Sequence, residues 1–192
     1  MKNKDMVRFG VVSIGVMFAA LVGGCASSQA NQDAAKKNGE PVYYAVAVLR
    51  PTKDQKASGR VKFSEAFGKV KIEADITGLD PSSKHAIHIH EFGDCSAPDG
   101  ASAGGHYNPQ AMQHGSPEAE MHHAGDMGNL VTDKTGHAKF SLEVSGMSIS
   151  GLVNPILGRG VIVHKNADDF ISQPTGGAGA RIACGVIGAT SK

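Results

Sequence analysis

The dominant pattern from residue 41 onward is a short alternation of apolar and polar side chains. Alternation with a period of two indicates half-buried β-strands. Gly, Pro, Asp and Asn interrupt the runs, as in Gly78-Leu79-Asp80-Pro81, and favour turns there. Eight strands are predicted, over residues 42–49, 60–67, 69–76, 84–92, 128–132, 137–144, 160–164 and 180–187, and no segment has a convincing helical periodicity.

Eight short strands with glycine-rich connections predict an all-β fold. We expect an antiparallel sandwich or flattened barrel whose two faces enclose one core. Two connections, residues 92–126 and 165–179, are long, and structureless loops of that length are usually functional. The length of 192 residues fits one domain, and we find no internal repeat.

The N-terminal segment differs from the rest. Residues 1–8 carry two lysines and an arginine, and residues 9–22 form an apolar run too short to span a bilayer. Gly23-Gly24-Cys25 follows. This pattern resembles a bacterial lipoprotein signal, and a plain secretory leader is the alternative.

The lipoprotein resemblance implies a signal peptide over residues 1–24 and an acylated Cys25. Several acyl chains together anchor a protein stably to a membrane. Ala26 follows the cysteine, which resembles lipoproteins sent to the outer membrane, so a periplasmic or surface-facing place in the cell envelope is expected. Residues 25–40 are small and polar and predict a flexible tether with a mean reach of roughly 20 Å. The domain is expected over residues 41–192.

Charge and cysteine content narrow the function class. The net charge is +1, and removal of residues 1–24 would leave −1, so nucleic acid is not an expected partner. With Cys25 acylated, Cys95 and Cys184 remain to pair in an oxidising compartment, and two buried free thiols are the alternative. A disulfide that closes the chain between Cys95 and Cys184 would contribute roughly 4 to 5 kcal/mol of stability in the chain-entropy model.

Most of the candidate chemistry lies between residues 85 and 126. Seven of the nine histidines fall there: His85, His88, His90, His106, His114, His122 and His123. Strand alternation puts His88 and His90 on one face. Three histidines with an aspartate suit zinc, and an all-imidazole set suits Cu(II). Chance clustering of surface histidines is the alternative.

Six segments, taken in order, resemble one enzyme family from Val42 to Gly188. They read HIHEFGDC, GGHYNP, HG, HAGDMGN, VIVHKNADD and AGARIACGVIG, and they are similar to the copper/zinc superoxide dismutases. The resemblance implies a Greek-key β-barrel that converts superoxide to dioxygen and hydrogen peroxide as copper alternates between Cu(II) and Cu(I). Protection of the cell envelope from external superoxide would be its role.

The resemblance also implies the site residues. The copper ligands would be His88, His90, His106 and His164, and the zinc ligands His106, His114, His123 and Asp126. His106 would be a shared imidazolate and, with Arg181, a catalytic residue. Asp168 would orient His88 and His114, and Thr175 would narrow the substrate channel, although a turn threonine is nearly as well supported.

Other histidines and acids receive plainer interpretations. The H-x-G-D spacing selects His123 as the ligand over its neighbour His122. His85 is expected to pack or form hydrogen bonds, and His137 to be solvated. Asp169 is expected to be a surface acid.

Two departures from the better-known eukaryotic pattern stand out. Cys95 directly follows Asp94, as in periplasmic bacterial enzymes, whereas Phe92-Gly93-Asp94 resembles eukaryotic sequences. The loop at residues 165–180 is short and has no clear counterpart for some steering charges. A homodimer is compatible with the resemblance, but its mode does not carry over.

Two other function classes remain open at this point. One is a copper-delivery or metal-buffering relative without turnover, and the other is a β-sandwich lipoprotein that serves adhesion or envelope structure. The complete ligand sets and Arg181 favour the enzyme, because non-catalytic relatives typically lack one of these.

Overall fold

The computed structural model describes residues 42–191, which form an all-β domain. The strands are β1 (Tyr44–Pro51), β2 (Ser58–Ala66), β3 (Lys69–Thr77), β4 (Lys84–His90), β5 (Asp126–Val131), β6 (Ala138–Ser145), β7 (Gly160–His164) and β8 (Arg181–Ala189), with one 3-10 turn, η1 (Ala101–Ala103). The predicted eight strands are confirmed, and their ends differ by only a few residues. Within the described range, no helix has the length and hydropathy needed to cross a membrane.

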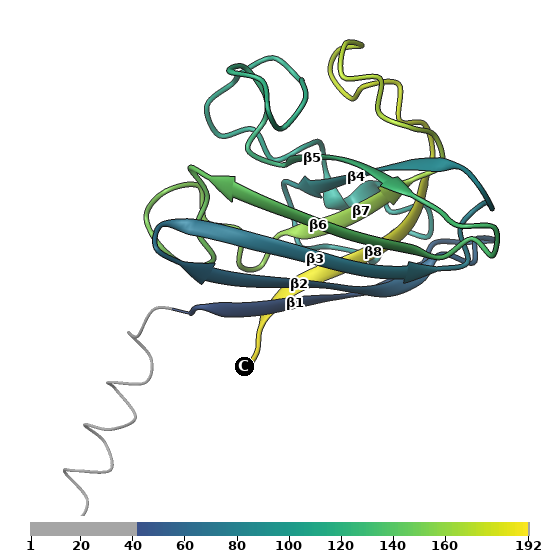
Figure 1. Ribbon diagram of the computed structural model, residues 1–192, viewed down its shortest axis with the longest axis horizontal. Coiled ribbons are helices and arrows are strands. Elements are labelled where there is room, and N and C mark those ends of the chain that lie inside the picture. The colour runs from purple at the N-terminus through teal and green to yellow at the C-terminus, as the bar shows by residue number, and fades with distance from the viewer. Residues whose placement is uncertain (1–41, 192) are drawn as a thin grey trace, which may run out of the picture. The chain divides into compact units, whose positions relative to one another are not determined.

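The strands form a nearly closed antiparallel barrel (Figure 1). Their spatial order is β5-β4-β7-β8-β1-β2-β3-β6. The connections from β3 to β4 and from β6 to β7 therefore pass between the two halves of the barrel, which is the Greek-key arrangement. Antiparallel neighbours in this order confirm the predicted fold class.

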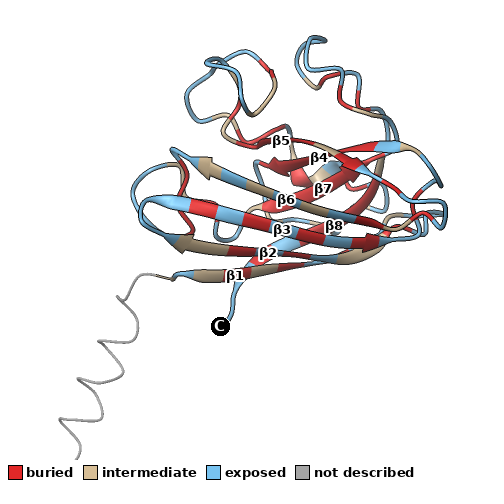
Figure 2. Cartoon of the chain, in the orientation of Figure 1, coloured by how far each residue is buried: buried red, intermediate tan, exposed pale blue. Residues whose placement is uncertain are grey.

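The alternation seen in the sequence places one side of each strand in the core. In β3, Val70, Ile72, Ala74 and Ile76 are buried, while the residues that alternate with them face solvent. Figure 2 shows this alternation as red and blue bands along the strand. Burying several such branched side chains contributes about 1.5 to 3 kcal/mol each, which is the main stabilisation of a barrel of this size.

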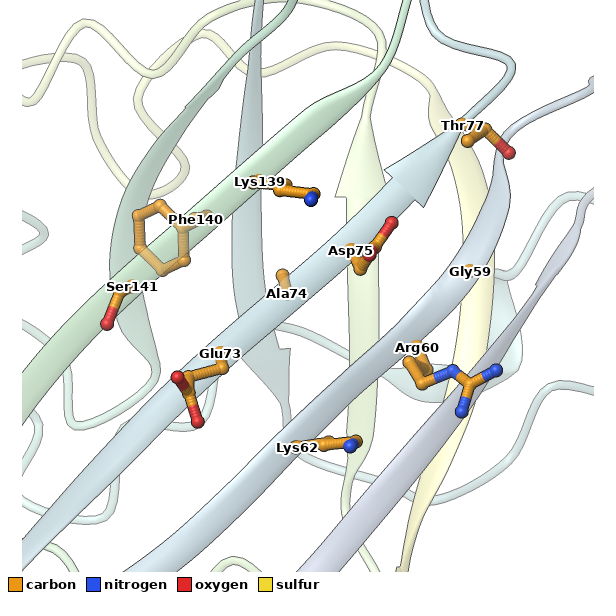
Figure 3. A pocket seen from close by; sticks show the side chains of 10 residues that line it. All are labelled: Gly59, Arg60, Lys62, Glu73, Ala74, Asp75, Thr77, Lys139, Phe140 and Ser141. Carbon is orange, nitrogen blue, oxygen red and sulfur yellow. The ribbon is translucent and has the colours of Figure 1, made fainter.

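The outer face of β2, β3 and β6 carries a ladder of opposite charges (Figure 3). Arg60 lies opposite Asp75, and Lys62 lies opposite Glu73. On the other side, Asp75 lies opposite Lys139. Opposite charges at paired positions stabilise a solvated sheet face modestly, so we interpret this shallow hollow as ordinary surface.

The two long loops predicted from the sequence cross the same outer wall of the barrel. A disulfide joins Cys95 in the first loop to Cys184 in β8, with a Cα–Cα distance of 5.8 Å, which confirms the predicted pairing. The second loop is tied to β5 through Asn129, whose side chain bonds both the backbone N–H and the carbonyl of Asp168, at 2.7 and 2.9 Å. The loops are thus fixed against the strands they cover.

Candidate metal centre

Strand β4 supplies two histidines from its outward face. Ile87 and Ile89 point into the core, and the alternation turns His88 and His90 to the opposite side. The outward face of an antiparallel barrel is normally exposed to solvent, yet both imidazoles are buried, at 0% and 1% exposure. The long loops cover them, so this stretch of the wall has a buried face on each side.

Four buried histidines gather over β4 and β7. Ligand atoms of His88, His90, His106 and His164 all lie within 4.8 Å of one another. His164 ends β7, the neighbour of β4, and its Nε2 lies 3.3 Å from Nε2 of His90. An isolated bridge between residues 90 and 106 brings His106 to the same place. We call this group the first cluster.

Hydrogen bonds fix which nitrogen of each ring faces the first cluster. His88 Nε2 donates to Asp168 Oδ2 (2.8 Å), His90 Nδ1 to the Gly104 carbonyl (3.0 Å) and His164 Nδ1 to the Gly179 carbonyl (3.3 Å). The opposite nitrogen of each neutral ring then keeps a free lone pair. This is the arrangement of metal-binding histidines.

The electrostatics keep these rings unprotonated, as metal ligation requires. Burial lowers the pKa of His90 to about 2 and that of His164 to about 4, and the charge of Arg181 contributes in the same direction. Burial likewise lowers the pKa of His88 well below its usual value. Neutral imidazole is therefore the form present near neutral pH.

A second cluster surrounds Asp126 at the start of β5. Its Oδ1 lies 3.0 Å from Nδ1 of His106, 3.1 Å from Nδ1 of His114 and 3.4 Å from Nδ1 of His123. The Nδ1 atoms of His106 and His123 are also 3.4 Å apart. Four ligands placed tetrahedrally around zinc, with Zn–N near 2.0 Å, are separated by about 3.3 Å. The observed spacing matches that value.

His88 also comes within 4.8 Å of the His106, His114 and Asp126 ligand atoms. We nevertheless include His123 as the fourth member of the second cluster. His88 Nε2 is occupied by Asp168, whereas His123 meets two members of the set at tetrahedral spacing. His106 belongs to both clusters. Its Nδ1 makes the contacts in the second cluster, which leaves Nε2 for the first.

Asp126 remains ionised in this setting. Burial raises its pKa, but the hydrogen bonds from His106 and from the backbone N–H of His123 outweigh burial and hold the pKa well below its usual value. Gly115 N–H also points at the carboxylate, at 3.2 Å. A permanent negative charge among three imidazoles suits a divalent cation.

Asp168 connects the two clusters from behind. Its Oδ2 accepts from His88 Nε2 and its Oδ1 from His114 Nε2, each at 2.8 Å. Gly176 packs directly over this bridge with φ of +65°, and a Cβ there would lie 2.6 Å from His114 Nε2. Only glycine fits the position, because it combines the left-handed backbone with the required close approach.

Arg181 begins β8 beside the first cluster. Its Nη1 donates to the Gly100 carbonyl and its Nη2 to the Gly104 carbonyl, both at 2.6 Å. The Gly104 carbonyl also accepts from His90 Nδ1, so the guanidinium and a cluster imidazole share one acceptor. The Cys95–Cys184 disulfide holds that loop next to β8.

The remaining predicted residues lie outside the clusters. His85 is buried and bonds the His164 carbonyl at 3.0 Å. His122 bonds the His123 carbonyl at 2.7 Å. His137 is partly exposed and pairs with Asp75 at 2.8 Å. Thr175 is half-buried in the second loop, where its carbonyl accepts from Ala178 N–H. Cys25 and the segments over residues 1–24 and 25–40 lie outside the described residues.

Sequence reasoning missed several groups that orient the histidines. The carbonyls of Gly104 and Gly179 are backbone atoms and leave no side-chain signal. Asn129 and Gln173 are side chains, and Gln173 brackets His114 by accepting from its N–H at 2.8 Å and donating to its carbonyl at 2.9 Å. Of these groups, only Asn129 carried a sequence signal, because it directly follows the HAGDMG segment within a predicted strand.

Comparison with known proteins identifies the family. A family model described as copper/zinc superoxide dismutase matches residues 57–187. The chain belongs to this family. It is 45% identical over 152 residues to a superoxide dismutase [Cu-Zn] of Paramecium bursaria Chlorella virus 1, covering 75% of this chain and 77% of the relative. It is 44% identical over 155 residues to the Yarrowia lipolytica enzyme of that name, covering 77% and 98%.

Structural similarity agrees with the sequence match. The crystal structure of the clock protein EA4 superposes with a TM-score of 0.71 at 37% identity, covering 79% of this chain and 97% of that one. The protein is thus a copper- and zinc-dependent enzyme that disproportionates superoxide to dioxygen and hydrogen peroxide. The metal-buffering and adhesion alternatives lose their support, because the viral and Yarrowia lipolytica relatives bear the name of the enzyme.

Proposed function

We propose that the first cluster is the copper site and the second is the zinc site of this dismutase. Copper would bind His88, His90, His106 and His164, and zinc would bind His106, His114, His123 and Asp126. The observation that carries this assignment is a set of three buried nitrogens without a hydrogen-bond partner, His88 Nδ1, His106 Nε2 and His114 Nδ1. Orphaned buried polar atoms are rare, and a metal ion at each cluster would satisfy all three.

The donor sets suit the two metals. Four imidazoles fit copper, and three imidazoles with a carboxylate at tetrahedral spacing fit zinc. Bound copper supplies a one-electron couple, Cu(II)/Cu(I), through which one superoxide is oxidised to dioxygen and a second is reduced to the level of peroxide. The peroxide product needs two protons, which a group of the protein or water must deliver.

His106 is the residue placed to handle one of these protons. Its Nδ1 lies in the second cluster, 3.0 Å from Asp126 Oδ1, and its buried Nε2 has no partner. In this proposal the two roles of Nε2 alternate: it would bind copper when unprotonated, and in the other half of the cycle it would hold a proton that it then donates to the product. The second proton comes from water.

Metal reloading tests this function. We expect metal-free protein to consume superoxide only after copper is added, and zinc alone to restore no activity, because zinc has no accessible redox couple. The measurement is superoxide consumption by protein loaded with zinc, with copper, or with both. Stoichiometric copper binding without turnover would contradict the proposed copper site.

Arg181 is proposed to guide the anionic substrate. A guanidinium is permanently charged and is held here by two carbonyls, which accept hydrogen bonds but do not neutralise it. Its Nη2 shares the Gly104 carbonyl with His90 Nδ1, and Arg181 pairs with His164 in the β7–β8 register, so the guanidinium lies beside the first cluster. Thr175, in the loop just before β8, is proposed to narrow the same approach.

Arg181→Gln should lower kcat/KM for superoxide by about 10-fold or more and weaken its dependence on ionic strength, because one steering charge is lost. Arg50→Gln, which removes an exposed charge from β1, is the control and should change little. Equal effects of the two substitutions would mean that overall charge, and not a local guide, sets the rate.

We also propose a place for the enzyme in the cell. The charged and apolar pattern of residues 1–24, followed by Cys25, supports a bacterial lipoprotein anchored in the cell envelope, with residues 25–40 as a tether to the domain over residues 41–192. Ala26 after the cysteine supports the outer membrane as its site. The Cys95–Cys184 disulfide suits an oxidising compartment. Such a dismutase would remove superoxide that reaches the cell from outside.

Cys25→Ser should release the enzyme from the membrane fraction into the soluble fraction when it is expressed in a bacterium that processes lipoproteins. Its specific activity should not change. The measurement is activity and mass of protein in each fraction, with mass spectrometry of the N-terminal peptide. An unmodified Cys25 in the wild-type protein would contradict the anchor.

A homodimer is proposed on the basis of exposed apolar residues. Val48 and Val186, on the adjacent strands β1 and β8, are 59% and 41% exposed, and Phe92 is 52% exposed. Val186 also packs near Gly93, so the three form one neighbourhood. Sedimentation velocity of the metal-loaded enzyme tests this, and a monomer at micromolar concentration would contradict it.

A further inference from the structure

One end of the barrel carries large apolar side chains that project into solvent. Phe67, in the β2–β3 turn, is 104% exposed, and Leu152, in the β6–β7 loop, is 102% exposed. Val153 and Tyr43 are 56% and 52% exposed. We call these four residues the apolar tip. Single exposed apolar residues are normal, but a group of this size at one end marks an interaction surface.

Hydrogen bonds place the segments of the apolar tip together. Glu65, next to the β2–β3 turn, donates its N–H to the Tyr43 carbonyl at 2.8 Å, and its Oε2 accepts from Ile149 N–H at 2.6 Å. Ser150 Oγ accepts from Val42 N–H at 2.7 Å. The turn, the loop and the first described residues therefore share one end of the barrel, at the left of Figure 1.

Phe67 gains nothing from its position within the domain. Ala66 pairs with Lys69, so Phe67 and Gly68 form a two-residue turn, with φ of +52° and +73°. Such type I′ turns favour Asn-Gly, and a bulky residue at positive φ is strained. The phenyl ring is also fully exposed. Its burial can therefore come only from a contact outside the described domain.

The chain enters the domain at the same end. Val42 follows Cys25 by 17 positions, and a coil of that length has a mean end-to-end distance of roughly 20 to 25 Å. An acyl group on Cys25 would keep this end close to a bilayer. Among the charges at this end, Lys69 and Glu143 pair with each other at 2.7 Å, and the Glu65 carboxylate accepts from Ile149 N–H, so the tip offers apolar surface more than net charge.

We propose that the apolar tip inserts into the interfacial region of the membrane that carries the anchor. This inference rests on the proposed acylation of Cys25 and adds the orientation of the domain relative to the membrane. Aromatic and branched apolar side chains favour the headgroup boundary. The two loops that cover the metal centre leave another side of the barrel, at the top of Figure 1, so in this orientation they would stay in water. Figure 2 shows the tip segments largely in the colour of exposed residues.

A single tryptophan can report this insertion, because the chain has none. Leu152→Trp in the full acylated chain, reconstituted into phosphatidylcholine vesicles that contain brominated lipid, should be quenched several-fold more than Lys134→Trp. Lys134 is exposed in the β5–β6 turn, at the far end of β3, where Ile76 pairs with Ala138. Equal quenching at both positions would overturn the proposal. This is also the result expected if a protein partner, and not the bilayer, covers the tip.

A second variant and a second anchor separate this inference from the lipoprotein proposal. Phe67→Asn suits the turn and should fold, keep its activity and reduce quenching of Leu152→Trp at least twofold; unchanged quenching would count against insertion of the turn. If Cys25 carries no acyl chain, a hexahistidine tag in place of residues 1–25 can hold the same variants on nickel-chelating vesicles. Quenching on these vesicles would support insertion of the apolar tip even though acylation of Cys25 had been disproved. Absence of quenching would overturn insertion of the tip.

Discussion

His164→Ala is expected to abolish dismutation and copper binding while zinc stays bound. His164 ends β7 and reaches only the first cluster, where its Nε2 lies 3.3 Å from Nε2 of His90. The second cluster is built from the first long loop and the start of β5, and it loses no ligand in this variant. Loss of a direct ligand should lower activity by at least about 100-fold, more than loss of an outer hydrogen-bonding partner does.

The measurement is metal content and superoxide consumption after reloading with both metals. His123→Ala provides the mirror case, in which zinc should be lost first. His137→Ala removes a surface imidazole that pairs only with Asp75, and both metals and activity should be retained. Full activity of His164→Ala, or loss of zinc together with copper, would show that the clusters are not divided as proposed.

The strands could be predicted because their pattern depends on local alternation. In β3 every second residue is buried, and the expected and observed ranges differ by one residue. β4 is different, because six consecutive residues are buried. Its two outward histidines are covered by loops that arrive from distant parts of the chain, and no local pattern reports that cover.

In the candidate site, too, local sequence patterns could be interpreted, whereas contacts from distant parts of the chain could not. The H-x-G-D spacing and the family resemblance pointed to the residues that the structure gathers, including His123 instead of His122. The partners that set each tautomer could not be predicted, because two of them are the carbonyls of Gly104 and Gly179. Their positions depend on left-handed backbone at glycines and on a loop held by a disulfide.

Asp168→Asn is expected to weaken copper binding more than zinc binding. The carboxylate accepts from two rings at once, through Oδ2 from His88 and through Oδ1 from His114. An amide has one acceptor and one donor, so one ring must face an N–H group. That ring then needs a lone pair on Nε2 and carries its proton on Nδ1, the atom proposed to bind the metal.

The backbone decides which ring is affected. Phe170 N–H donates to Asp168 Oδ1 at 2.7 Å, so the amide oxygen should occupy that position and continue to accept from His114. The amide nitrogen then faces His88, a member of the copper cluster. Loss of such an orienting partner typically costs 10- to 100-fold in metal affinity, and here we expect that loss for copper.

Competition titration against chelators of known affinity, done separately for copper and zinc, measures the effect. Asp169→Asn is the matched control in the same loop, because that side chain bonds Ser172 and the nearby backbone and touches neither cluster. A greater loss of zinc than of copper would place the amide nitrogen toward His114, against the hydrogen bond from Phe170. Unchanged affinity for both metals would show that Asp168 does not fix the tautomers, and the two clusters would then owe their ligand geometry to packing alone.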